Sequence, residues 1–170
     1  MITDPAAPRP TRALGADFTV PVRDRYFEDY APGASYDYGF IAMSENEIID
    51  FATRYDPQPI HTDPVWAATG PFGGLIASGW HTSAVGMRLF VDHYVSRVAG
   101  LASPGMDELR WPRPVRPGDV LRTHVTILEA RASGSRPDRG IVTSALEMLN
   151  QDDESVFTVR AVNFFGRRPP

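Results

Sequence analysis

The stretch at residues 55–64, which reads Y-D-P-Q-P-I-H-T-D-P, constrains the fold more than any other part of this chain. Its two inner prolines lack a backbone N–H, hold φ at about −65° and disfavour helix in the residue before each of them. We therefore expect Asp56–Ile60 to be a stiff, extended connector between two helices. Such a connector fixes the separation of the Asp56 carboxylate and the His61 imidazole, as an acid/base pair requires. The alternative interpretation is a proline-rich loop in which Asp56 caps a turn and His61 lies on the surface.

Helical patterns lie on both sides of this connector. The sequence S-E-N-E at residues 44–47 has the form of a capping box, and apolar residues then recur at helical spacing as far as the connector. After the connector, Asp63 followed by proline predicts the start of a short helix that runs to about Thr69. The longest helical pattern runs from about Ser78 to Val98. Its first half, which includes Trp80, is apolar on most sides and is expected to be buried.

Alternating apolar and polar residues predict a set of β-strands. They are a short stretch at 18–22, a strand at 36–42, a possible strand at 106–111, and later runs at 121–127, 141–148 and 156–165. Three prolines keep the loop at 112–119 out of regular structure. Turn signals join the last three runs as hairpins. Helices followed by successive strands predict an α+β fold, with the helices on one face of an antiparallel sheet.

Composition narrows the class of protein. The chain has 170 residues, a formal charge of −4 and no cysteine, which predicts one domain without disulfides or a thiolate nucleophile. The basic residues form no long block, so nucleic acid is not expected as a partner. There is no signal-peptide pattern and no apolar run that could cross a bilayer, so we expect no membrane partner and a cytoplasmic location. Residues 1–16 are expected to be a flexible arm, followed by a single domain at 17–170.

The order of these elements, together with the D-P-Q-P-I-H sequence, resembles the MaoC-like dehydratases, also called R-specific enoyl-CoA hydratases. The resemblance covers roughly residues 36–165. The positions that match the family's hydratase motif are Asp56, Pro59, Ile60, His61 and Ala67. The resemblance implies a hot-dog fold, in which an antiparallel sheet wraps around one long central helix. It also implies a homodimer in which the two sheets join edge to edge.

The resemblance further implies chemistry on the trans-2 double bond of an enoyl thioester, carried by coenzyme A or by acyl carrier protein. Asp56 and His61 would divide the general-base and general-acid work of adding or removing water. The N–H of Gly79 would hold the thioester oxygen. The implied substrate-binding positions are Gln58, Ser78, Trp80, Arg113 and Arg116. No cofactor is implied beyond the coenzyme A of the substrate.

Three positions depart from the family's pattern. Tyr55 stands where a small residue is usual, Gln58 stands where asparagine is usual, and Met87 falls near a serine of some members. None of the three removes the acid/base pair, so these departures bear on the identity of the substrate and the efficiency of the chemistry.

Two other functions remain open. A thioesterase on the same fold would need a carboxylate on or near the long helix, and no acidic residue lies between Leu75 and Val91. A non-catalytic acyl-CoA-binding protein would keep the fold without turnover. Arg113 and Arg116 could contact the phosphates of coenzyme A or could belong to an ordinary solvated loop. The histidines form no short ligand cluster, so no metal site is expected.

Overall fold

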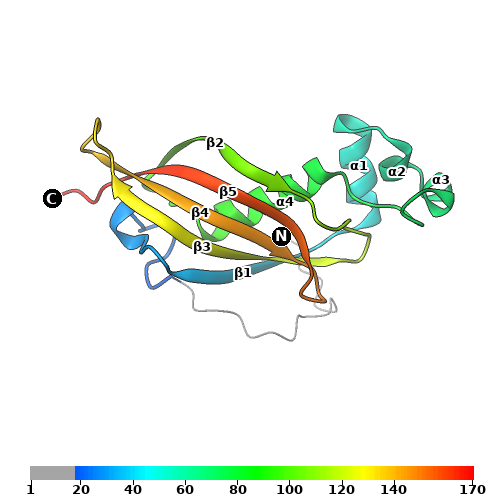
Figure 1. Cartoon of the computed structure of the whole chain (residues 1–170), viewed down its shortest axis with the longest axis horizontal. Helices are drawn as coiled ribbons and strands as arrows, with labels where there is room; N and C mark the ends of the chain where they lie inside the picture. Colours follow the sequence, from blue (N-terminus) through cyan, green and yellow to red (C-terminus); the bar gives the residue numbers. More distant parts are fainter. Residues whose placement is uncertain (1–17) are drawn as a thin grey trace.

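A computed structural model describes residues 18–170, so the arm predicted at residues 1–16 lies outside the described residues. A five-stranded sheet curves over one long helix, and three shorter helices gather at one end (Figure 1). In chain order the elements are η1 (Phe27–Asp29), β1 (Ser35–Ala42), α1 (Glu45–Tyr55), α2 (Pro59–Thr62), α3 (Pro64–Thr69), α4 (Gly79–His93), β2 (Gly100–Arg110), β3 (Val120–Ala132), β4 (Arg139–Leu149) and β5 (Ser155–Gly166). The predicted α+β class is confirmed.

The sheet is antiparallel, with the strand order β1-β3-β4-β5-β2. In its centre, Val125 of β3 pairs with Leu146 of β4, and both side chains are buried. Their neighbours His124 and Glu147 also pair and are only partly buried, because successive side chains of a strand point to opposite faces. The sheet therefore has one apolar face, and the strands predicted in β1, β3, β4 and β5 are confirmed.

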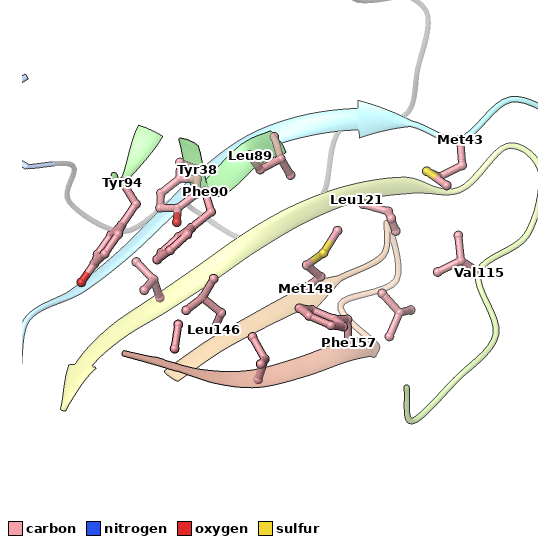
Figure 2. Close-up of a cluster of buried hydrophobic side chains, with 14 of the residues drawn as sticks. Tyr38, Met43, Leu89, Phe90, Tyr94, Val115, Leu121, Leu146, Met148 and Phe157 are labelled. Atoms are coloured by element: carbon pink, nitrogen blue, oxygen red, sulfur yellow. The ribbon is translucent and has the colours of Figure 1, made fainter. Parts of the chain in front are cut away.

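The hydrophobic core fills the space between α4 and this apolar face (Figure 2). Leu89 and Phe90 of α4 belong to the same buried cluster as Met148 and Phe157 of the sheet. The helix and sheet approach so closely that a Cβ placed on Gly86 would lie 2.7 Å from the sulfur of Met148. The core thus fixes where α4 lies, and with it the start of that helix.

Helices α1 and α3 begin as the sequence predicts. The Ser44 hydroxyl accepts a hydrogen bond from the Glu47 N–H at 3.3 Å, which forms the predicted capping box at the start of α1. The Asp63 carboxylate accepts from the N–H groups of Val65 and Trp66, each at 3.0 Å, at the start of α3. Both caps depend on residues within three positions of each other, so the local sequence is enough to predict them.

The expected connector is only half extended, and this is a correction. Pro59 and Ile60 belong to α2, a single helical turn at Pro59–Thr62. The turn is possible because proline is tolerated at the first position of a helix, where its missing N–H would have no partner in any case. His61 therefore lies on a helical turn.

The long helix ends at His93 instead of Val98, because residues distant in sequence bind its last carbonyl groups. The guanidinium of Arg25 donates to the backbone oxygens of His93 at 3.1 Å and Tyr94 at 2.8 Å. The Tyr30 hydroxyl also donates to the Tyr94 oxygen, at 2.8 Å. Without these donors, the carbonyl oxygens would accept hydrogen bonds from a further helical turn or from water. No local signal predicts this end.

Two strand predictions are also corrected. Residues 18–22 form no strand, because the ring of Phe18 stacks on Tyr36 and the guanidinium of Arg25 lies 3.5 Å from the centre of the same ring. Strand β2 begins at Gly100, well before the predicted start at Met106. Pairing with β5 extends it through a glycine- and proline-containing segment that is tolerated at the edge of a sheet.

Candidate active site

The side chains of Asp56 and His61 converge. Asp56 directly follows α1 as its C-cap residue, and His61 lies on α2. His61 Nε2 is 3.5 Å from Asp56 Oδ2, and the two side chains are 7% and 19% exposed, respectively. The surface-loop interpretation of this stretch is therefore wrong, since the imidazole is buried and faces the carboxylate.

The other ring nitrogen of His61 is held by the backbone. Nδ1 lies 2.8 Å from the carbonyl oxygen of Ile76. A carbonyl oxygen can only accept a hydrogen bond, so Nδ1 carries a proton and donates it. Any proton that His61 exchanges must therefore pass through Nε2, the atom that faces Asp56.

Two side chains hold the carboxylate of Asp56. The Ser78 hydroxyl donates to Oδ2 at 2.6 Å, and the amide of Gln58 donates to Oδ1 at 2.7 Å. These hydrogen bonds, first that from Ser78 and then that from Gln58, together with the charge of His61, hold the pKa of Asp56 below its usual value, although burial opposes them. The geometry therefore favours an ionised carboxylate beside the imidazole.

Gly79 is the first residue of α4 and directly follows Ser78. The first N–H groups of a helix have no partner within the helix, and they lie at its positive end. In this first turn, the Trp80 N–H donates to the Ser78 hydroxyl at 3.2 Å, and the Thr82 N–H donates to the Ser78 backbone oxygen at 3.0 Å. The N–H of Gly79 thus begins the helix next to the residue that binds Asp56, where the resemblance predicts an amide for a thioester oxygen.

Trp111 covers the start of α4, and sequence reasoning missed it. A Cβ placed on Gly79 would lie 2.6 Å from two ring carbons of Trp111, so glycine is needed for this close approach. The indole N–H donates to the Ser83 hydroxyl at 3.2 Å, which in turn donates to the backbone oxygen of Gly79 at 2.9 Å. Trp111 also meets Trp80 edge to face, with ring centres 5.4 Å apart. No local signal predicts a contact across so many residues.

The loop at 112–119 lies beside the same helix start. The Val115 backbone oxygen accepts from the N–H of Ala77, at 2.8 Å. Within this loop, Arg113 pairs with Glu154 at 3.3 Å, and Arg116 donates to the backbone oxygen of Phe72 at 2.7 Å. Both predicted arginines therefore lie on the loop that reaches the site, and both have partners within the protein.

The first half of the long helix is only partly buried, which corrects the expected burial: Leu89 and Phe90 are buried, but Trp80 is not. Trp80 is 59% exposed, and Met87 and Val91 further along α4 are 42% and 44% exposed. The sheet covers only one side of α4, and these residues lie on the uncovered side. Of the residues predicted to bind substrate, Trp80 presents the largest apolar surface to solvent.

His81, two residues after Gly79, is buried against α1. It is 8% exposed and stacks on the ring of Phe51, with the ring centres 4.7 Å apart. Within residues 18–170 its Nδ1 has no hydrogen-bond partner. Burial lowers the pKa of His81, against a smaller opposing effect of the charge on Glu47.

Residues 18–170 contain no group of three or more histidine, aspartate or glutamate side chains placed to hold a metal ion. In the same part of the chain, no helix has both the length and the apolar character needed to cross a membrane.

Comparisons with known proteins place the chain in a family. Residues 28–147 match the family described as the MaoC like domain. The crystal structure of a MaoC-like dehydratase from Rhodospirillum rubrum is 41% identical, with a TM-score of 0.80, and the match covers 86% of this chain and 99% of that one.

Two curated proteins are also similar. The uncharacterized protein YdeM of Bacillus subtilis is 31% identical over 76% of this chain and 91% of its own length. The 3-hydroxyacyl-thioester dehydratase Z of Mycobacterium tuberculosis is 32% identical over 64% of this chain and 74% of its own length. The likeness to solved structures confirms the hot-dog fold that the sequence resemblance implied. This chain therefore belongs to the MaoC-like family of hot-dog hydratases and dehydratases.

Proposed function

We propose that this protein is an enoyl-thioester hydratase/dehydratase, which adds water across the trans-2 double bond of an acyl thioester or removes water to form it. The observation that carries the proposal is the pairing of His61 Nε2 with Asp56 Oδ2 at 3.5 Å beside the start of α4. Each partner is oriented by other groups, so the two exchangeable positions face each other. Preorganisation of this kind is what general acid/base catalysis requires.

In the hydration direction, a water molecule held by Asp56 and His61 loses a proton to one of them as its oxygen bonds to C3. The electron pair of the double bond moves towards the thioester, and the resulting enolate takes a proton at C2 from the other member of the pair. The pair holds one transferable proton before the step and one after it, now on the other member, and transfer between Asp56 Oδ2 and His61 Nε2, 3.5 Å apart, restores the starting arrangement. Dehydration is the same sequence reversed. The assignment of the two protons belongs to the coupled pair, not to either residue alone.

The developing negative charge on the thioester oxygen needs a donor. The N–H of Gly79 is suited to this role, because it lies at the positive end of α4 and beside the residue that binds Asp56. Coenzyme A and acyl carrier protein both present an acyl chain as a thioester, and the substrate we propose is an acyl thioester of either kind. Arg113 and Arg116 are our candidates for contacts with its phosphates.

The thioesterase alternative is less well supported. Such an enzyme would activate water with a carboxylate on the long helix, but the acidic residue of α4 is Asp92, which pairs with Arg88 at 2.6 Å. Asp92 also lies near the end of the helix, far along the chain from Gly79. The other alternative is a protein that binds acyl thioesters without turnover. The activity experiment below distinguishes it from an enzyme.

The activity is tested by following the loss of enoyl-thioester absorbance with crotonyl-CoA and a longer enoyl-CoA. We expect turnover by the wild type and a loss of about 100- to 10,000-fold in kcat for Asp56→Asn and His61→Ala. The matched controls are Asp92→Asn and His124→Ala, which make the same changes away from the site. Binding of acyl-CoA without turnover by the wild type would contradict the hydratase proposal and support the binding protein.

We also propose that the protein forms a homodimer through the uncovered side of α4 and the edge strand β2. The exposed apolar residues there are Trp80, Met87 and Val91 of α4 and Leu101 and Met106 of β2. An apolar surface of this kind is normally covered by a partner. Sedimentation should give a two-chain species, and Leu101→Glu should shift it towards single chains. Leu128→Glu on β3 is a control of similar exposure, and a wild type that sediments as a single chain would contradict the proposal.

A further inference from the structure

The hydroxyl of Ser78 joins the predicted acid/base pair to the long helix. Ser78 is 0% exposed. Its Oγ donates to Asp56 Oδ2 at 2.6 Å and accepts from the N–H of Trp80 at 3.2 Å. A serine hydroxyl has a single proton to donate. Because Asp56 receives that proton, Ser78 has none left to donate to a substrate atom.

We propose that Ser78 is a positioning residue of the reaction, whose hydroxyl fixes Asp56 Oδ2 beside His61 Nε2 and ties the carboxylate to the first turn of α4. The inference rests on the proposed function. It replaces the direct substrate contact expected for Ser78 with an action through Asp56. The same helical turn begins with Gly79, so one buried side chain sets the carboxylate relative to the amide that would hold the thioester oxygen.

The groups that face the Asp56 carboxylate in residues 18–170 come from three places. His61 on α2 is the titratable group, Gln58 before α2 contributes its amide, and Ser78 before α4 contributes its hydroxyl. Ser78 makes the largest contribution to the lowered pKa of Asp56. Its removal should therefore raise the pKa of Asp56, while the contacts from Gln58 and His61 remain.

Ser44 supplies a matched control. It caps α1 as Ser78 caps α4, since its hydroxyl accepts from a backbone N–H of the first turn. Ser44 is exposed, and its hydroxyl donates to Glu47 at 2.6 Å. Ser44→Ala thus removes the same atom and the same kind of helix cap as Ser78→Ala, but it leaves Asp56 untouched.

The first measurement is the pH dependence of kcat and KM for the wild type and both alanine variants. We expect Ser78→Ala to lower kcat about tenfold, with little change in KM, because the lost hydrogen bond acts on the carboxylate. The fall in kcat/KM on acidification should begin at higher pH in Ser78→Ala than in the wild type or Ser44→Ala. An unchanged acid limb, or a rise in KM alone, would overturn the proposal.

The second measurement does not depend on activity. The carboxyl carbon of Asp56 is titrated by NMR, with its signal assigned by its loss in Asp56→Asn. The midpoint should move to higher pH in Ser78→Ala and stay in place in Ser44→Ala. If the wild type turns over no enoyl thioester but the midpoint moves, the proposed function fails while the link from Ser78 to Asp56 stands. If turnover is seen and the midpoint does not move, the positioning role alone is refuted.

Discussion

Helices α1 and α4 both begin after a capping serine, but the two serine hydroxyls donate to different partners. Each helix follows a serine whose hydroxyl accepts a hydrogen bond from a first-turn N–H. At α1 the third helical residue is Glu47, which bonds back to Ser44, so the cap closes on itself. At α4 the third helical residue is His81, which is buried, and the serine hydroxyl instead reaches Asp56, 22 residues earlier in the chain.

This difference shows how one capping motif can be either purely local or part of a site. At α1 the reciprocal partner is the exposed carboxylate of Glu47, which stabilises the helix start. The Ser44 hydroxyl donates to this carboxylate, so it has no proton left to donate to another residue. At α4 no acidic residue occupies the first turn, so the positive end of the helix and the serine proton are both available to Asp56. A cap without its reciprocal acid is thus one sequence signal that a helix start serves another group.

Gly79→Ala, which adds one methyl group to the first residue of α4, should have the largest effect on stability of the changes at these two helix starts. Gly79→Ala should lower the free energy of unfolding by about 1–3 kcal/mol, because the new Cβ would collide with the Trp111 ring. It should also reduce turnover, since the first turn must shift. Urea unfolding and the enoyl-thioester assay measure the two effects.

The corresponding change at α1 is Glu45→Ala, at the first residue of an exposed helix start. It should lower the free energy of unfolding by about 0.5 kcal/mol.

In a Trp111→Ala background, Gly79→Ala should lower the free energy of unfolding clearly less than it does alone, since the colliding ring is gone. Equal costs in the two backgrounds would show that Trp111 is not the reason for glycine at this position.

A smaller effect is expected at His81, the third residue of α4, in the pH dependence of the free energy of unfolding. Burial lowers the pKa of His81 below its ordinary value of 6.5, while Phe51 and Glu47 face it from α1. The unfolded chain therefore binds a proton that the folded chain resists, and the free energy of unfolding should fall as pH drops through about 6.5. His81→Leu should make this fall less steep, as measured by urea unfolding at a series of pH values.

The lowered pKa of Asp56 acts in a different range. Its stabilising contribution is present above the ordinary aspartate pKa of 3.8 and is lost as pH falls through the folded value below that. The two groups can therefore be told apart along one pH series. Wild-type and His81→Leu curves that run parallel between neutral pH and pH 5 would contradict the role given to His81.

Much of the fold could be predicted, because the signals are local. The caps of α1 and α3 each join residues a few positions apart, and the strands β3, β4 and β5 show their alternation in the sequence itself. The proximity of Asp56 and His61 was also predictable, because only a short proline-restrained segment separates them. Residues Gln58, Ser78 and Gly79 entered the site through resemblance, and the roles of the site residues stay predictions.

Three of the errors have a common cause. The end of α4 depends on Arg25 and Tyr30, the early start of β2 depends on β5, and the loss of the strand at 18–22 depends on packing against Tyr36. Each partner is distant in sequence, so no window of neighbouring residues contains the competing interaction. The expected burial of Trp80 failed because apolar content does not say which side of a helix the sheet will cover.

The sequence by itself determined the elements whose free energy comes from neighbouring residues: capped helix starts, alternating strands and the restrained Asp56–His61 segment. Only the tertiary structure decided the contact of Ser78 with Asp56, the carbonyl that orients His61, and the placement of Trp111 over Gly79. These contacts form when the core brings the start of α4 against α1, α2 and the loop before β3. Their geometry is a property of the closed fold, because each joins groups that the unfolded chain keeps far apart.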